Sequence, residues 1–204
     1  MDFLIKPLEE TVFSFEDITA LLHAAFLERL NQGLCFTTSR MSASDFQKSA
    51  EGGTVLVAFI PETSVLLGTG MIHLRKDETG VCYADLEHKG VLPSVKRIGV
   101  GSALEKELQL IGASKGAQYL VSDTAIKARS SIRFHLNNGY FKWLFVSFPS
   151  TDYYSVVFRK QVSSNMRPDN LPLITFHYYL SFIRTILTKK KDGSRRKWIS
   201  LIRK

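Results

Sequence analysis

The stretch over residues 91–104 constrains the fold more than any other part of this 204-residue chain. A β-rich run over residues 81–92 leads into it, and a helical pattern over residues 99–115 leads out of it. The turn between them carries Lys96, Arg97 and two glycines separated by one residue. Glycines let the backbone approach a ligand closely, and the free amides at a helix start attract an anion. The sequence therefore predicts a pyrophosphate-binding turn between a strand and a helix.

Two better-known phosphate motifs do not fit this turn. A P-loop needs four residues between its glycines and a Gly-Lys-Ser/Thr ending, which is absent here. The dinucleotide fingerprint needs a third glycine where Leu104 stands. A glycine turn that only allows tight packing is the structural alternative.

The spacing resembles motif A of the GNAT superfamily, the acetyl-CoA-dependent N-acetyltransferases. That pattern reads Gln/Arg-x-x-Gly-x-Gly/Ala, with Val-x-Pro just upstream. Val91 and Pro93 fit the upstream part, and Gly99 and Gly101 fit the glycine pair. Lys96 stands at the Gln/Arg position, a departure that keeps a cation where the family faces phosphate.

A second segment, residues 128–140, resembles the family pattern Asn-x-x-Ala-x-x-Phe-Tyr-x-x-x-Gly-Phe. The matching positions are Phe134, Gly139 and Tyr140. The departures are Ala128 for Asn, Ser131 for Ala and His135 for Tyr. Two motifs in the right order give a resemblance at superfamily level over residues 3–160.

The resemblance implies an α+β GNAT fold. Its central twisted sheet of about seven strands is mostly antiparallel, is flanked by helices, and contains a splayed parallel pair at the cofactor site. We expect strands over residues 4–8, 54–60, 65–74, 81–92, 118–124, 140–148 and 153–160. We expect helices after the caps Ser14 and Ser42, over 99–115 and over 128–139. Two domains are predicted: residues 1–160, the acetyltransferase domain, and residues 161–204, a linker and basic tail.

The resemblance implies acetyl-CoA as the acetyl donor. The residues expected to bind it are Val91, Leu92, Lys96, Arg97, Ile98, Gly99, Val100, Gly101, Ser102, Ser131 and Phe134. An amide near Val91 would polarise the thioester carbonyl. Gly90 is expected to mark a β-bulge that opens the gap for the pantetheine arm.

Strand alternation over residues 83–88 indicates candidates for a general base. It places Tyr83, Asp85 and Glu87 on one face, and Ala84, Leu86 and His88 on the other. Two carboxylates on one face are costly unless they meet a cleft. Since a carboxylate on this strand often takes the amine proton in the family, Asp85 and Glu87 are the candidates, with Glu87 nearer the thioester. Simple pairing with cations, or with the substrate amine, has equal weight.

His135 occupies the position of the family tyrosine and is the candidate acid for the leaving thiolate. The alternative is that it only packs beside the cofactor sulfur. The other histidines show no metal-ligand spacing, so no metal is predicted. Neither Cys35 nor Cys82 falls at a motif position, which argues against an acyl-enzyme.

The net charge of +8 belongs to the tail. Residues 1–158 hold 15 Lys/Arg against 17 Asp/Glu, whereas residues 159–204 hold 12 against 2. Within the tail an apolar stripe consists of Leu173, Phe176, Leu180, Ile183 and Leu187. A polar stripe consists of His177, Ser181, Arg184, Thr185 and Thr188, and two basic runs follow it.

The stripe is too short to span a bilayer, which needs ~20 residues. It suits an interfacial helix on an anionic membrane, through residues 173–204. The alternative is a helix whose apolar stripe docks on the domain or on a second subunit of a homodimer. Nucleic acid is disfavoured because no base-reading module is present.

We therefore predict an N-acetyltransferase in which a primary amine of a small molecule, such as an amino sugar, attacks acetyl-CoA directly with general-base assistance. The alternative is a catalytically weak acyl-CoA-binding module that its tail tethers to a membrane or a partner. No signal peptide is visible at residues 1–7, so the expected location is the cytoplasm, with peripheral attachment to the inner face of the membrane.

Overall fold

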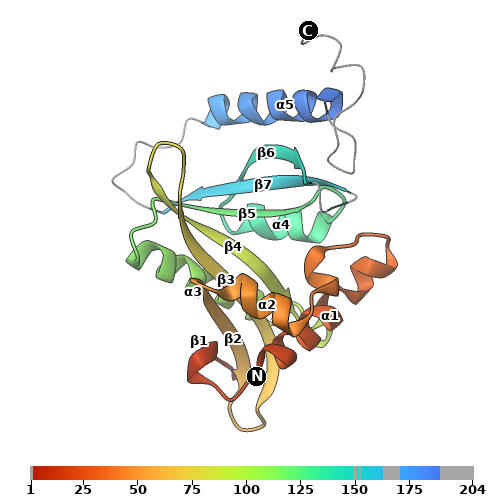
Figure 1. Cartoon of the computed structure of the whole chain (residues 1–204), viewed down its shortest axis with the longest axis vertical. Coiled ribbons are helices and arrows are strands. Elements are labelled where there is room, and N and C mark those ends of the chain that lie inside the picture. Colours follow the sequence, from red (N-terminus) through yellow and green to blue (C-terminus); the bar gives the residue numbers. More distant parts are fainter. Residues whose placement is uncertain (1, 149–150, 152, 163–170, 189–204) are drawn as a thin grey trace. The chain divides into compact units, whose positions relative to one another are not determined.

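A computed structural model describes residues 2–148, 151, 153–162 and 171–188. The described residues contain seven strands in one sheet, in the order β1-β2-β3-β4-β5-β7-β6 (Figure 1). The strands are β1 Leu4–Pro7, β2 Thr54–Ile60, β3 Val65–Lys76, β4 Cys82–Val91, β5 Tyr119–Ala125, β6 Phe141–Ser147 and β7 Tyr154–Gln161. The helices are α1 Phe15–Asn31, α2 Ala43–Ala50, α3 Val100–Ser114, α4 Arg129–Asn137 and α5 Leu171–Thr188, with short turns η1 Leu8–Glu10, η2 Thr37–Arg40 and η3 Pro93–Val95. This mixed sheet, with β4 and β5 as its parallel pair, confirms the predicted fold class.

The chain forms two compact units. The first spans residues 1–120, and the second takes in residues 121–161 together with α5. The predicted division at residues 160/161 stays a prediction, and the splay between β4 and β5 stays one as well. The predicted linker over 163–170 and the basic runs beyond residue 188 lie outside the described residues.

Local capping signals set the helix boundaries as predicted. Ser14 and Asp17 form a reciprocal capping box at the start of α1, and Ser42 accepts the amide of Asp45 at the start of α2. Gly116 and Gly139 follow α3 and α4 with φ of 88° and 81°, a region that glycine enters without steric cost. These boundaries follow from hydrogen bonds over three or four residues, so sequence patterns find them.

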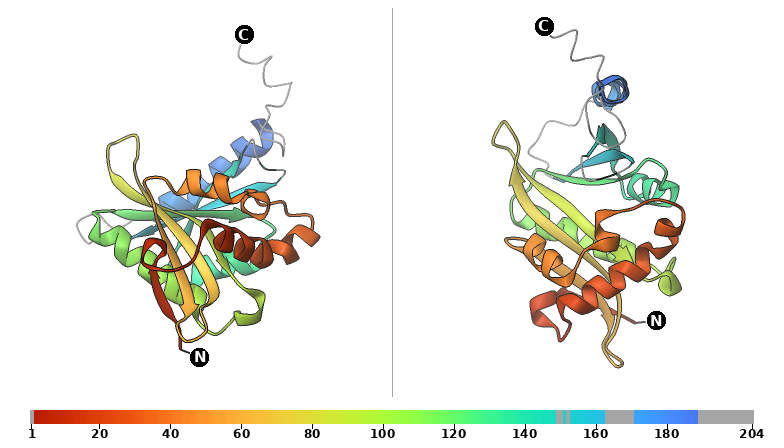
Figure 2. Two further views of the ribbon diagram at one scale, coloured as in Figure 1. Left: turned by 60° about the horizontal axis from the view of Figure 1, so that its bottom comes forward. Right: turned by 45° about the vertical axis from the view of Figure 1, so that its right-hand side comes forward.

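In the first unit, β2, β3 and β4 lie between α1 and α3 (Figure 2). On the α1 side, Ile18, Leu22 and Met71 belong to one buried cluster. On the α3 side, a Cβ built at Gly112 would lie 3.1 Å from the Ala84 side chain. Burial on both faces makes this part of the sheet a rigid platform for β4.

Glu105 of α3 is a charged residue on the side of the helix that meets the sheet. Its side chain is buried, 1% exposed, and accepts a 2.8 Å hydrogen bond from Lys89 Nζ of β4. Gln109 also donates to it, at 3.1 Å. The buried side of α3 can include this carboxylate because Lys89, a cation from the sheet, neutralises it.

In the second unit, β6 and β7 form an antiparallel hairpin, and α5 packs on β6. Ser181 Oγ accepts the backbone N–H of Phe145 at 2.8 Å, and Thr185 Oγ1 donates to the Phe145 carbonyl at 2.9 Å. The Phe182 ring lies 4.8 Å from the Phe145 ring. The helix therefore docks through Phe182 and through Ser181 and Thr185 of the predicted polar stripe, and the alternative in which the apolar stripe docks on the domain is wrong.

Candidate active site

A β-bulge in β4 shapes the candidate site. Thr69 pairs with Gly90 and Met71 with Glu87, so two residues of β4, His88 and Lys89, oppose Gly70 alone. His88 takes φ of 48°, in the left-handed region. The bulge was predicted at Gly90 and lies instead at the two residues before it.

The bulge also changes which side chains share a face. His88 Nδ1 lies 2.8 Å from Thr38 Oγ1, and its ring lies 5.4 Å from that of Phe46 of α2. Glu87 contacts His73, whose Nε2 lies 3.2 Å from the carbonyl oxygen of Glu51 at the end of α2, so Glu87 and His88 face the same side of the sheet. The prediction that His88 lies on the opposite face is wrong. The extra residue shifts the alternation of the strand by one position.

Two basic residues of β3, His73 and Arg75, contact the predicted carboxylates. His73 Nδ1 lies 3.0 Å from Glu87 Oε2, and Arg75 Nε donates to Asp85 Oδ2 at 3.1 Å. A longer contact of 3.6 Å joins Arg75 Nη2 to Glu87 Oε1. The pairing alternative for both carboxylates is thus present in the structure. About a third of the Glu87 side chain is still exposed, so its oxygens can also meet a ligand.

The pKa of His88 is lowered by its surroundings. Burial lowers its pKa below the ordinary 6.5, the nearby Glu87 carboxylate acts in the opposite direction, and His73 adds to the lowering. The imidazole is therefore neutral near pH 7. Its contact with Thr38 links β4 to the segment between α1 and α2.

The predicted phosphate turn is exposed and its amides are available. Gly99 begins α3 with φ of 96°, and no side chain of the described residues caps this end. The first amide to bond within the helix is that of Ala103, which donates to Gly99 O at 2.9 Å. The amides of Val100, Gly101 and Ser102 therefore lack an acceptor within the helix. A Cβ at Gly99 would meet no atom within 4 Å, so the turn borders open space.

Two cations flank these amides. Lys96 and Arg97 are exposed, as is Ile98. Lys96 Nζ donates to Glu28 Oε2 of α1 at 3.0 Å, and this bond lowers the pKa of Glu28. A surface ion pair of this kind contributes about 0–1 kcal/mol, so an anion can draw Lys96 away. Upstream, the amide of Leu92 donates to Leu67 O at 2.9 Å and fixes the end of β4 beside Val91.

The second unit holds the other predicted residues. His135 is 2% exposed, its Nδ1 lies 2.8 Å from Ser131 O, and its Nε2 lies 3.1 Å from Ser122 Oγ. Its ring stacks on Phe158 at 4.6 Å, while Phe134 is half-buried beside it. With both nitrogens engaged, His135 has the surroundings of a packed core histidine. Its role as an acid stays a prediction, as do the cofactor contacts of Ser131 and Phe134.

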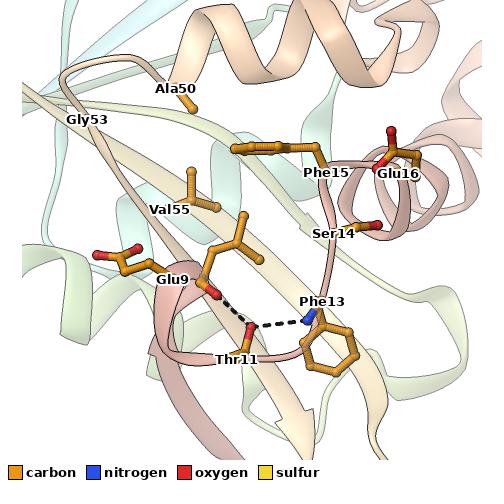
Figure 3. Close-up of a pocket in the computed structure, with 10 residues that line it drawn as sticks. Glu9, Thr11, Phe13, Ser14, Phe15, Glu16, Ala50, Gly53 and Val55 are labelled. Atoms are coloured by element: carbon orange, nitrogen blue, oxygen red, sulfur yellow. Dashed lines mark hydrogen bonds between the residues drawn. The ribbon is translucent and has the colours of Figure 1, made fainter.

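A separate hollow of about 470 Å³ lies among η1, the segment that leads into α1, the start of α1, the end of α2 and the start of β2 (Figure 3). Phe13, Phe15 and Val55 contribute apolar walls, and Glu9 and Glu16 also line it. None of its lining residues belongs to the predicted catalytic or cofactor set.

Comparison with known proteins rests on structure, since neither a protein-family model nor a curated protein matches this sequence. The yncA protein of Salmonella typhimurium, solved with its cofactor acetyl-CoA, superposes with a TM-score of 0.60 at 15% identity, over 83% of this chain and 99% of that one. A ribosomal-protein-alanine N-acetyltransferase from Brucella melitensis gives 0.60 at 16%, over 78% and 99%. A GNAT-family acetyltransferase from Staphylococcus aureus gives 0.61 at 15%, over 79% and 100%.

The chain has the GNAT fold. The matched share of this chain leaves about a fifth unmatched, which in length corresponds to residues 161–204. Within the GNAT fold described here, the turn at Gly99 opens the helix after β4, as the motif resemblance implied.

Sequence reasoning missed three residues of the β3–β4 face. His73 and Arg75 could have been found, because the antiparallel register of β3 and β4 sets His73 opposite Asp85 and Arg75 opposite Tyr83. His88 could not have been found in this way, because the side of the sheet that it faces depends on a bulge that no local sequence pattern indicates.

Proposed function

We propose that this protein is an N-acetyltransferase that moves an acetyl group from acetyl-CoA to a primary amine of a small-molecule acceptor. The observation that carries this proposal is the exposed, uncapped start of α3, directly after the strand with Asp85 and Glu87. Uncapped amides at a helix start, flanked by two cations, fit a diphosphate. The chemistry needs an anion site and a carboxylate on one strand–turn–helix unit, and the uncapped helix start and Glu87 would supply them.

The residues of the turn would bind acetyl-CoA, which supplies the activated acetyl group when bound. The amides over 99–102 and the side chains of Lys96 and Arg97 would hold its diphosphate. Val91 and Leu92, at the end of β4, would contact the pantetheine arm, and Ser131 and Phe134 of the second unit stay predicted contacts of the cofactor.

In this proposal Glu87 takes a proton from the acceptor ammonium, so that the amine becomes neutral and nucleophilic. Its hydrogen bond to His73 fixes one carboxylate oxygen and leaves the other toward the longer Arg75 contact. Asp85 has a short bond to Arg75 Nε and is the weaker candidate. We assign it to orienting Arg75.

For the acceptor we propose an amino sugar of an envelope polysaccharide precursor. The basic tail supports this choice, since it would keep the enzyme in the cytoplasm at the inner face of the membrane, where such precursors are handled. A peptide amine is the competing acceptor, because the Brucella relative is named for a ribosomal-protein alanine.

Thiol release from acetyl-CoA over a panel of amino sugars, other small amines and an alanine-initiated peptide tests the proposal. We expect turnover with an amino sugar, and a fall in kcat of about 10²–10⁴-fold in Glu87→Gln. The KM for acetyl-CoA should stay unchanged in that variant. Glu107→Gln, an exposed carboxylate on α3, is the matched control and should behave like wild type. A Glu87→Gln enzyme within about twofold of wild type would remove Glu87 from the mechanism.

A second candidate function is an acyl-CoA-binding module with little turnover. The buried, doubly hydrogen-bonded His135 favours it, because the family position for the acid then holds no available proton donor. Calorimetric binding of CoA without thiol release for any amine of the panel would establish this alternative.

A further inference from the structure

The C-terminal helix presents an apolar face away from the strand it packs on. Phe176, Tyr179, Leu180, Ile183 and Leu187 are each 45–59% exposed. They recur every three or four residues, so they occupy one side of α5. Exposed large apolar side chains in a contiguous stripe mark an interaction surface.

The orientation of α5 follows from two hydroxyl groups. Ser181 and Thr185, one helical turn apart, bond the N–H and the C=O of Phe145 in β6. Thr185 is buried and Ser181 is half-buried, although neither is apolar. These bonds, together with the Tyr178 and Phe182 rings beside Phe145, hold one side of the helix against β6, and the exposed apolar residues lie on the other side.

The charge of this segment indicates the occupant. Arg184 is the charged residue of α5, and the helix contains no acidic residue. The chain directly after it, residues 189–197, carries six Lys/Arg and only Asp192 as an acid. A second copy of this chain would bring the same cations to the shared surface, which disfavours a homodimer through this face.

No described helix is long and apolar enough to cross a bilayer. An exposed apolar stripe beside a polybasic run is instead the pattern of a helix that lies in the membrane interface, with its apolar side among the acyl chains and its cations near anionic headgroups. We propose that the outward face of α5, with the basic run after it, binds a membrane surface rich in anionic phospholipid. This inference goes beyond the acetyl transfer proposed above and does not depend on it.

Vesicle flotation of the full-length protein tests the inference. We expect it to float with phosphatidylcholine vesicles that contain about 30 mol% phosphatidylglycerol. With vesicles of phosphatidylcholine alone it should remain in the bottom fraction of the gradient. Raising the salt from about 50 mM to about 500 mM should weaken binding at least about tenfold, because headgroup attraction is screened.

A double variant, Phe176→Ser with Leu180→Ser, should bind anionic vesicles at least about tenfold more weakly. Its melting temperature should match wild type, because both side chains are exposed. Leu110→Ser, which changes a leucine of similar exposure on α3, is the control and should bind like wild type. Replacing Lys189, Lys190 and Lys191 by Gln should reduce binding without changing the fold.

Three results would overturn the inference. The first is a wild-type protein that does not float with anionic vesicles. The second is a double variant that floats as wild type does. The third is a wild type that sediments as a dimer, becomes a monomer in the double variant and ignores vesicles, which would make the face an interface between copies. Thiol release is not a readout in any arm, so loss of lipid binding and loss of enzymatic activity are distinguishable.

Discussion

At the scale of single residues, His88 combines two costs that the fold tolerates. Its φ of 48° places a side chain in the left-handed region, which costs about 1–2 kcal/mol for a residue other than glycine. Its ring is buried and bonded to Thr38, which favours the neutral imidazole. Backbone strain of this kind is common at functional positions, and here the strained residue connects β4 to the segment between α1 and α2.

The lowered pKa of His88 predicts a pH dependence of stability. The unfolded chain binds this proton near pH 6.5 and the native state binds it only at lower pH, so stability is complete above 6.5 and declines as the pH falls below it. Urea denaturation from about pH 8 to about pH 5 should show a shallower decline in His88→Asn than in wild type.

His23→Asn is the control for this series, since His23 is exposed. Its curve should retain the slope of wild type. Equal slopes in wild type and His88→Asn would mean that His88 protonates freely in the native state.

At the scale of elements, the β4–turn–α3 unit depends on Gly99. Its φ of 96° turns the chain from the strand end into the helix, and the missing Cβ leaves space in front of the first amides. Gly116, at the other end of the helix, has a similar φ of 88° and equally open surroundings. Both glycines have a positive φ, but only Gly99 lies in the predicted phosphate turn.

This pair separates stability from binding. Gly99→Ala and Gly116→Ala should each lower the free energy of unfolding by about 1–2 kcal/mol. Only Gly99→Ala should weaken CoA binding, by about tenfold, because it crowds the amides at the helix start. Calorimetry with CoA and urea denaturation measure the two effects. Equal CoA affinity in both variants would place the diphosphate elsewhere.

At the scale of the whole molecule, α5 is a packed part of the second unit and not a detached tail. β6 stands at the edge of the sheet order, and an exposed edge is a site for unwanted pairing. The hydroxyls of Ser181 and Thr185 bond both backbone groups of Phe145, and the Phe182 ring covers its side chain. The segment predicted to be a tail therefore includes a helix, α5, that covers the edge strand β6 of the sheet.

Truncation tests this conclusion. A chain that ends at residue 162 should be less stable than one that ends at residue 188 by at least about 2 kcal/mol, because the Phe145 side chain, 1% exposed in the structure, would lose its cover. Thermal melts of the two truncated chains and of wild type measure the difference. Identical melting curves would mean that α5 adds nothing to the stability of the unit.

Much of this architecture follows from local patterns. The capping box at Ser14, the cap at Ser42 and the left-handed glycines after two helices rest on contacts over a few residues, and so does the Gly99 turn. Strand alternation likewise placed Asp85 and Glu87 on one face. The physical basis is the fixed period of helix and strand, which a sequence carries without knowledge of its partners.

Other features were decided by contacts between distant segments. The bulge that turns His88 toward Thr38 depends on the register of β3 with β4, and Glu105 is buried because Lys89 arrives from the sheet. The outward apolar side of α5 follows from two bonds to Phe145, which lies 36 and 40 residues away in the chain. Periodicity tells which side chains share a face along an uninterrupted helix or strand, whereas tertiary contacts decide where a bulge breaks that period and which face turns inward.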